Sequence, residues 1–360
     1  MTEAESALHK AVEGERLGME EASALYAEAD FFALGQAAHS VRLRKHPDPM
    51  VTYVVDRNIN YSNICVCGCR FCAFFRAPDQ EGGYVLTREE LTRKIEETLE
   101  LGGTQILMQG GHHPTLSLSF YEEMLRYIKD AYPIHIHAFS PPEIVHFARL
   151  EGVDVGTVIE RLRAAGLDSI PGGGAEILVD SVRKAVSPNK CSASEWLWVM
   201  EEAHRQGMRT TATMMFGHEE EPSHRLEHLM ALRELQDRTG GFTAFIPWAF
   251  QPANTAIRKP PETAVSYLRL LAVSRLVLDN IENIQASWVT MGPKVAQLAL
   301  HFGANDFGST MIEENVVAAA GVHFRLSVQE IRSIIEAAGF KPRQRTMAYG
   351  LVEESHHDDP

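Results

Sequence analysis

Four of the chain's five cysteines lie within the short stretch NICVCGCRFCAFF at residues 63–75, and the fifth is Cys191. A disulfide framework is typical of short secreted chains whose cysteines are spread out. The crowding of thiols into one loop of a 360-residue chain favours metal or redox chemistry instead. Within this loop, Cys65, Cys69 and Cys72 have the spacing C-x3-C-x2-C.

Iron and zinc are the two metals that such a loop favours. Three thiolates on one loop can each bind one iron of a [4Fe–4S] cube, which leaves the fourth iron without a protein ligand. A structural zinc site closes with four Cys or His ligands, usually as two separated pairs. No second Cys/His pair of suitable spacing accompanies the loop in the sequence, so we favour iron.

The rest of the chain alternates strand-like and helix-like segments, which must position the cysteine loop. Strand-like stretches lie at 104–111, 134–140, 168–175, 209–217, 241–250, 283–288 and 303–308, and amphipathic segments of helix length include 88–101, 119–131, 193–207 and 224–239. Together with the strand before Cys65, the seven strand-like stretches make eight β units, and a candidate helix follows each unit. The alternation predicts an α/β fold, a (β/α)8 barrel of the TIM type. A doubly wound open sheet is the alternative.

The remaining organisation and the charge narrow the class of protein. We predict an N-terminal helical extension at residues 1–50, the barrel domain at residues 51–350 and a polar tail at residues 351–360. The net charge of −14 argues against a nucleic-acid partner, because phosphate binding needs a basic face. No apolar run reaches the ~18 residues of a membrane helix and no secretory signal is visible, so we expect no membrane partner and a cytoplasmic location.

The cysteine loop resembles that of the radical S-adenosylmethionine (SAM) enzymes, whose signature is Cys-x3-Cys-x2-Cys with an aromatic residue before the third cysteine. Only Cys65, Cys69 and Cys72 preserve this spacing and put Phe71 in that place, so Cys67 is expected to be a bystander. The resemblance implies a [4Fe–4S] cluster whose open iron is chelated by SAM, and an electron donor such as flavodoxin or ferredoxin. Electron transfer from the cluster would cleave SAM to methionine and a 5′-deoxyadenosyl radical.

The resemblance also implies that SAM lies across the strand ends. Gly110 and Gly111 end the second β unit, where members of the family commonly hold the SAM amino group on a glycine-rich strand end. Ser140 ends the next unit, and Glu176 follows three glycines after the fourth, where a carboxylate can accept hydrogen bonds from the ribose or ammonium group of SAM. Arg183 is a candidate partner for a carboxylate. The alternative for Glu176 and Arg183 is a tight turn and a helix surface.

Motifs outside the cysteine loop narrow the resemblance further. The stretches GGTQILMQGGHHP, PGGGAEIL and NDFGSTMIEENV are similar to those of the group that acts on futalosine-derived nucleosides and on deazaflavin precursors. The implied partner is a small nucleoside-derived carboxylate. The implied reaction joins a ribose carbon to an attached benzoate ring, and the ring then loses a proton and an electron.

That proton requires a base, and we predict His218 for this role. It ends a strand on the same rim, and an imidazole accepts a proton near neutral pH. Asp306 and Glu314 are the rivals, although carboxylates are weaker bases unless burial raises their pKa. A packed histidine, a different substrate within the same group, and a zinc-stabilised binding module stay open as alternatives.

Overall fold

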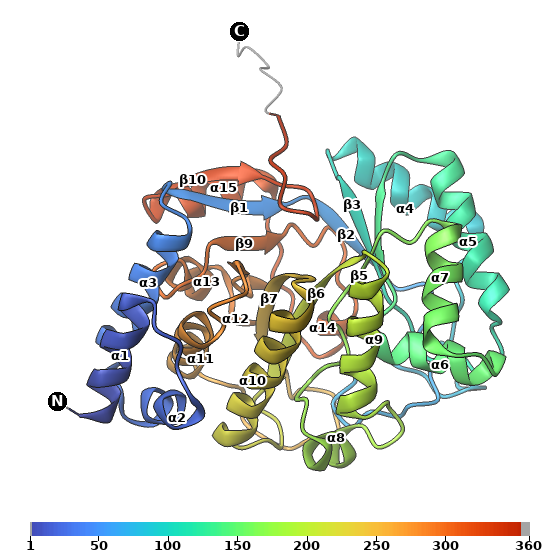
Figure 1. Ribbon diagram of the computed structural model, residues 1–360. Helices are drawn as coiled ribbons and strands as arrows, with labels where there is room; N and C mark the ends of the chain where they lie inside the picture. The colour runs from blue at the N-terminus through green and yellow to red at the C-terminus, as the bar shows by residue number, and fades with distance from the viewer. Residues whose placement is uncertain (1, 354–360) are drawn as a thin grey trace, which may run out of the picture.

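The computed structural model describes residues 2–353, which form parallel strands surrounded by helices (Figure 1). The strands are β1 (Met50–Val54), β2 (Asp56–Ile59), β3 (Gln105–Met108), β4 (His135–Ala138), β5 (Ser169–Ile170), β6 (Arg209–Phe216), β7 (Phe242–Ala249), β8 (Asn283–Ile284), β9 (Asp306–Ser309) and β10 (Lys341–Gln344). Each strand-like stretch predicted after the cysteine loop overlaps one of them.

The strands form a closed barrel, because the segment that contains β1 and β2 belongs to both sheets. β2 to β8 pair in chain order, and a second sheet has the order β10-β1-β9. β1 runs directly into β2, so this continuous segment pairs with β9 along its first half and with β3 along its second half. A bridge between Gln285 and Asp306 joins the end of β8 to β9. The barrel is therefore closed, and the predicted (β/α)8 architecture is confirmed.

The helices that follow the strands lie mostly on the outside of the barrel (Figure 1), except that residues 288–290 and 316–317, from two short helices, line its interior cavity. They are α4 (Arg88–Glu100), α5 (Leu118–Ala131), α6 (Pro141–Glu151), α7 (Val155–Ala165), α8 (Asp180–Val186), α9 (Ala193–Arg205), α10 (Pro222–Thr239), α11 (Ala264–Val277), α12 (Trp288–Met291), α13 (Pro293–Ala299), α14 (Val316–Ala319) and α15 (Val328–Ala337). No helix of the described residues is long and apolar enough to cross a membrane.

Several β units depart from the simple alternation, because two helices follow each of the strands β4, β5, β8 and β9. Those between β4 and β5 are α6 and α7. Gly152 ends α6 with φ of 67°, a left-handed conformation that glycine adopts without strain. Two residues later Asp154 begins α7, because its carboxylate accepts the N–H of Thr157.

The N-terminal helices are α1 (Glu3–Glu13), α2 (Met19–Glu28) and α3 (Phe31–Lys45); α2 packs against α10 and α11, α3 packs against α11, and α1 packs on α2 and α3 (Figure 1). Their apolar faces belong to the same hydrophobic core as the barrel. Gly35 lies under the ring of Phe302, where a Cβ would be 2.6 Å from a ring carbon. The domain bounds at residues 50 and 350 stay a prediction, and residues 354–360 of the predicted tail lie outside the described residues.

Candidate active site

The cysteine loop leaves the carboxyl end of β2 and is held from two directions. The N–H of Cys65 donates to the carbonyl of Arg76 (2.9 Å), which closes the loop on itself. The N–H of Arg70 donates to the carbonyl of Val186 (2.9 Å), which ties the middle of the loop to the end of α8. The loop is thus positioned over the rim of the barrel by backbone hydrogen bonds that leave its thiols free.

The environment of the thiols fits a group that is bound by thiolates. The N–H groups of Cys67 and His112 point at Sγ of Cys65, at 3.5 and 3.3 Å. A hydrogen bond with the Cys67 thiol, followed by these two amides, lowers the pKa of Cys65 to about 6 against the opposing effect of burial. Burial raises the pKa of Cys72, and backbone N–H groups that follow it in the loop oppose that rise. Amides that point at sulfur stabilise the thiolate, the form that binds iron.

Cys67 is the most deeply buried cysteine of the loop. It is 1% exposed and Cys69 is 6% exposed, whereas Cys65 and Cys72 are partly exposed. Its Sγ lies 3.1 Å from Nδ1 of His112, and the side chain of Asn189 donates to its carbonyl (3.1 Å). These contacts support the interpretation of Cys67 as a bystander that packs the loop against the rim.

Gly110 and Gly111 follow β3 directly beneath the cysteine loop. A Cβ on Gly110 would lie 2.4 Å from the ring of Tyr61, and one on Gly111 would lie 2.2 Å from the carbonyl oxygen of Ile64. These positions therefore require glycine because the loop packs directly on the strand end. SAM contact at Gly110 and Gly111 stays a prediction.

Ser140 belongs to a buried hydrogen-bond cluster around Glu143. The N–H and Oγ of Ser140 both donate to Oε2 of Glu143. The other carboxylate oxygen accepts the hydroxyl of Tyr61 (2.6 Å) and the N–H of Gly110 (3.0 Å). Burial raises the pKa of Glu143, and these hydrogen bonds oppose that rise. Glu143 thus joins the cysteine loop, the end of β3 and the start of α6.

Glu176 and Phe71 lie beside a partly buried cation, Lys190, that the sequence analysis did not identify. Nζ of Lys190 is 3.0 Å from Oε1 of Glu176 and 5.1 Å from the centre of the Phe71 ring. Oε2 of Glu176 is buried and has no hydrogen-bond partner in the described part of the chain. Glu176 has φ of 41°, a strained conformation that often marks functional positions.

Arg183 has a structural environment. Its guanidinium donates to the carbonyls of Cys191, Ala175 and Gly174, and it is 2% exposed. Oε2 of Glu176 lies farther away, at 3.6 Å. Because the guanidinium is occupied by backbone carbonyls, Arg183 supports the loop that carries Glu176, and we do not carry forward its predicted role as a ligand for a free carboxylate.

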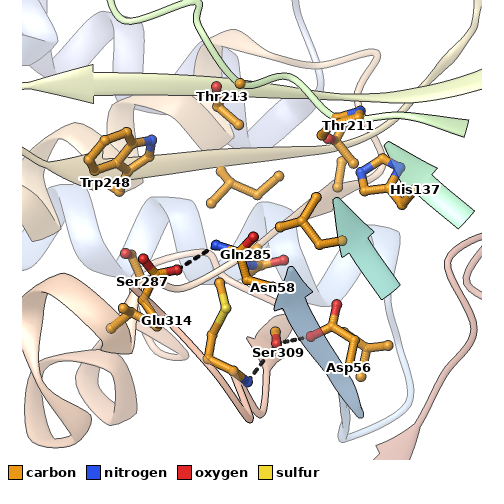
Figure 2. A pocket seen from close by; sticks show the side chains of 18 of the residues that line it. Asp56, Asn58, His137, Thr211, Thr213, Trp248, Gln285, Ser287, Ser309 and Glu314 are labelled. Carbon is orange, nitrogen blue, oxygen red and sulfur yellow. Dashed lines mark hydrogen bonds between the residues drawn. The ribbon is translucent and has the colours of Figure 1, made fainter. Parts of the chain in front are cut away.

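A cavity of about 250 Å³ occupies the interior of the barrel (Figure 2). Every strand from β1 to β9, or the residue directly after it, contributes to its wall. Its surface is mainly apolar, and its polar groups include Asn58, His137, Thr213 and Glu314. Trp248 faces the cavity and also packs with Phe71 against one small hydrophobic cluster. The cavity therefore extends from the barrel interior toward the rim that carries the cysteine loop.

Of the three predicted bases, only Glu314 lines this cavity. One of its oxygens accepts the side-chain N–H of Asn58 (2.8 Å), and the other accepts the N–H groups of Val316 and Val317. Burial raises the pKa of Glu314, and these hydrogen bonds oppose the rise.

His218 and Asp306 lie outside the cavity wall. The ring of His218 is fully buried, with Nε2 bonded to the carbonyl of Met215 (3.0 Å) and Nδ1 accepting the N–H of Glu219 (2.8 Å). Asp306 pairs with the guanidinium of Arg345. Neither side chain is placed to take a proton from a ligand, so we do not carry either forward as the base.

The residues that sequence reasoning missed come from segments far apart in the chain. Glu143 had a detectable signal, since Ser140 and Glu143 have the spacing of a capping box. Lys190 had none, because nothing in its local sequence indicates contact with a loop more than a hundred residues earlier. His137 lies within the strand-like stretch 134–140, and its place on the cavity wall depends on the closure of the barrel, which the local sequence does not indicate.

Comparisons with protein families match both halves of the chain. Residues 59–232 match the model of the radical SAM superfamily, and residues 239–357 match the model described as the CofH/MqnC C-terminal region.

Relatives of known name align along nearly the whole chain. A cyclic dehypoxanthine futalosine synthase of Halalkalibacterium halodurans is 48% identical over 96% of this chain and 94% of its own. One of Streptomyces coelicolor is 46% identical over 98% of this chain and 89% of its own. A 5-amino-6-(D-ribitylamino)uracil–L-tyrosine 4-hydroxyphenyl transferase of Methanopyrus kandleri is 43% identical over 93% of this chain and 94% of its own.

Solved structures agree with the fold. The hydrogenase maturase HydG of Carboxydothermus hydrogenoformans has a TM-score of 0.76 at 19% identity, covering 96% of this chain and 80% of its own. Methylornithine synthase PylB has a TM-score of 0.68 at 19% identity, covering 93% of this chain and 97% of its own.

Proposed function

Because the chain belongs to the radical SAM superfamily, in the family with the CofH/MqnC C-terminal region, we propose that it cyclises dehypoxanthine futalosine. The product is cyclic dehypoxanthine futalosine, in the futalosine route to menaquinone. The observation that carries this choice is the identity of 48% and 46% to two synthases of that name over nearly the full chain. The cytoplasmic location and a flavodoxin or ferredoxin as electron donor belong to the same proposal.

The family implies a [4Fe–4S] cluster and SAM, and the described residues fit both. Cys65, Cys69 and Cys72 hold the cluster in this proposal, since their loop offers free thiols with amides directed at sulfur. Phe71 and the pair of Glu176 and Lys190 hold SAM, because a carboxylate beside an ammonium complements the zwitterionic end of SAM. When bound, the two groups supply the radical that takes a hydrogen atom from the substrate.

The barrel cavity holds the substrate. Its mainly apolar wall excludes water, and its continuity with the rim beside Phe71 places the substrate next to the site of radical formation. The carboxylate of Glu314 accepts three N–H bonds and has about four acceptor sites, so one site is left for a substrate hydroxyl. We assign Glu314 to substrate binding because its hydrogen bonds already fix its orientation.

An anaerobic assay tests the proposal. The protein is reconstituted with iron and sulfide and mixed with SAM, reductant and dehypoxanthine futalosine. Mass spectrometry is expected to find 5′-deoxyadenosine and a product that is two hydrogen atoms lighter than the substrate. A protein that turns over only 5-amino-6-(D-ribitylamino)uracil with tyrosine, or only the substrate of aminofutalosine synthase, would contradict the assignment.

The zinc-binding alternative is decided by the family. Membership of the radical SAM superfamily makes the chain an enzyme, so the expectation of a zinc-stabilised binding module is not retained.

A further inference from the structure

Two histidines and one serine form a hydrogen-bonded chain inside the barrel. Nδ1 of His137 lies 2.7 Å from Oγ of Ser169, and the same Oγ lies 2.7 Å from Nε2 of His135. A hydroxyl has one proton to donate and lone pairs to accept, so Ser169 can receive a hydrogen bond from one imidazole while it donates to the other. The three side chains therefore form an unbroken path for a proton.

The path leads from the cavity toward solvent. His137 lines the cavity wall (Figure 2). Its exposed fraction is 5%, and that of Ser169 is 1%. His135 is partly exposed, and it is the first residue of β4, paired with the first residue of β3. The path therefore ends at the amino ends of the strands, opposite the rim that carries the cysteine loop.

We propose that His137, Ser169 and His135 carry away the proton that the substrate ring loses when the new carbon–carbon bond forms. This inference rests on the proposed function, because that reaction releases one ring proton inside a cavity that must exclude water. Since Nδ1 of His137 is bonded to Ser169, Nε2 is the nitrogen left to meet the ring.

The proposed transfer takes up one proton from the ring and releases one proton to solvent. Nε2 of His137 takes the ring proton while the C–H bond electrons remain in the ring. Nδ1 of His137 then gives its own proton to Oγ of Ser169, whose hydroxyl proton passes to Nε2 of His135. His135 releases one proton to solvent. The ring also loses one electron, which the [4Fe–4S] cluster in its oxidised state would accept under the proposed function, and this electron does not pass through these side chains.

The charged groups around the path favour transfer over storage of the proton. Burial lowers the pKa of His137 far below its usual value, and His135 and Arg345 lower it further. Burial also lowers the pKa of His135, where Asp168 opposes the decrease and Lys129 adds to it. An imidazole that cannot retain a positive charge must pass it on, which is the behaviour required of a relay.

The competing acceptor is Glu314, on the same cavity. Its oxygens accept N–H groups from Asn58, Val316 and Val317. These donors do not release or accept a second proton as a hydroxyl or imidazole does, so they offer no onward path. A proton on Glu314 would remain in the cavity.

The test compares the amount of cyclised product with the amount of 5′-deoxyadenosine, which counts hydrogen abstractions. In Ser169→Ala and His135→Gln, abstraction is expected to continue while product per 5′-deoxyadenosine falls at least about tenfold, since a positioned proton acceptor contributes about 10²–10⁴-fold. Thr243→Val is the matched control, because it removes a strand hydroxyl that bonds the carbonyl of Thr210 outside this path. Its ratio should equal that of the wild type.

The outcomes separate this inference from the proposed function. A wild-type protein that forms no cyclised product from dehypoxanthine futalosine overturns the function. A wild type that forms it, with unchanged ratios in Ser169→Ala and His135→Gln, overturns the relay alone. A loss confined to His137→Gln also overturns the relay, because the proton then leaves by another route.

If these variants fail to fold, a measurement on the wild-type protein tests the relay instead. The ratio is measured in mixtures of H2O and D2O. Transfer through His137, Ser169 and His135 moves several exchangeable protons. A plot of product per 5′-deoxyadenosine against the deuterium fraction should therefore curve below a straight line. A straight line overturns the relay.

Discussion

At the scale of single residues, the cysteine loop contains three cysteines that we propose as cluster ligands and a fourth, Cys67, that we do not. The thiol of Cys67 packs against His112, whereas Cys65 and Cys72 are partly exposed and Cys69 is buried. We expect Cys67→Ala to retain iron and SAM cleavage, and Cys69→Ala to lose both, because a three-thiolate cluster has no spare ligand. Iron and sulfide analysis with the visible spectrum measures this. Equal iron loss in the two variants would show that Cys67 ligates the cluster.

Glu314 permits a second prediction. Its carboxylate is held by Asn58 and two backbone amides, so it is oriented toward the cavity as a hydrogen-bond acceptor. Glu314→Gln is expected to raise KM about tenfold, since a hydrogen bond to a charged group contributes about 1.5–3 kcal/mol. Product per 5′-deoxyadenosine should not change. A fall in that ratio at unchanged KM would instead identify Glu314 as the base.

His218 provides the opposite case. Both ring nitrogens bond backbone groups, so the histidine stabilises the loop that follows β6. His218→Gln should lower the melting temperature, because a lost buried hydrogen bond costs about 1–3 kcal/mol. Its product per 5′-deoxyadenosine should equal that of the wild type. Scanning calorimetry and the product assay check the two halves, and a stalled reaction in a stable variant would return His218 to the catalytic site.

At the scale of elements, the start of α6 fixes the rim of the barrel. Glu143 caps the helix through Ser140 and also binds Tyr61 and Gly110. Glu143→Ala leaves several buried donors unpaired, each at a cost of about 1–3 kcal/mol. We expect a clear fall in melting temperature together with less iron per chain, while Glu143→Gln, which keeps the shape, should lose less of both. Unchanged iron in a destabilised Glu143→Ala would show that the cluster does not depend on this cap.

How far the sequence predicts the molecule depends on the distance between partners. The strands and several helices were predictable because hydrophobic alternation is local, and the three cysteines because they share one loop. The contact between Lys190 and Glu176 spans fourteen residues, and that between Tyr61 and Glu143 spans eighty-two. Such contacts follow from barrel closure, which no local pattern encodes. The same holds for β10, which pairs with β1 from the other end of the chain.

At the scale of the whole molecule, β1 and β10, which lie far apart in the sequence, pair at the barrel floor. The segment after β10 contributes Arg345, Met347 and Tyr349 to the cavity wall. Arg345 is 3% exposed and binds Asp306, the first residue of β9, which also accepts the hydroxyl of Thr52 in β1. This buried ion pair therefore joins three strands at the end of the cavity opposite the cysteine loop.

Breaking the pair should affect stability and reaction together. Arg345→Met leaves the carboxylate of Asp306 buried without a counter-charge, at a cost of about 3–5 kcal/mol. The second change, Asp306→Asn, removes that charge, so the double variant should recover part of the lost stability in urea unfolding. A loosened floor also admits water to the cavity, so product per 5′-deoxyadenosine should fall in the single variant and rise again in the double variant. Equal stability of the single variant and the wild type would mean that closure of the floor does not depend on Arg345.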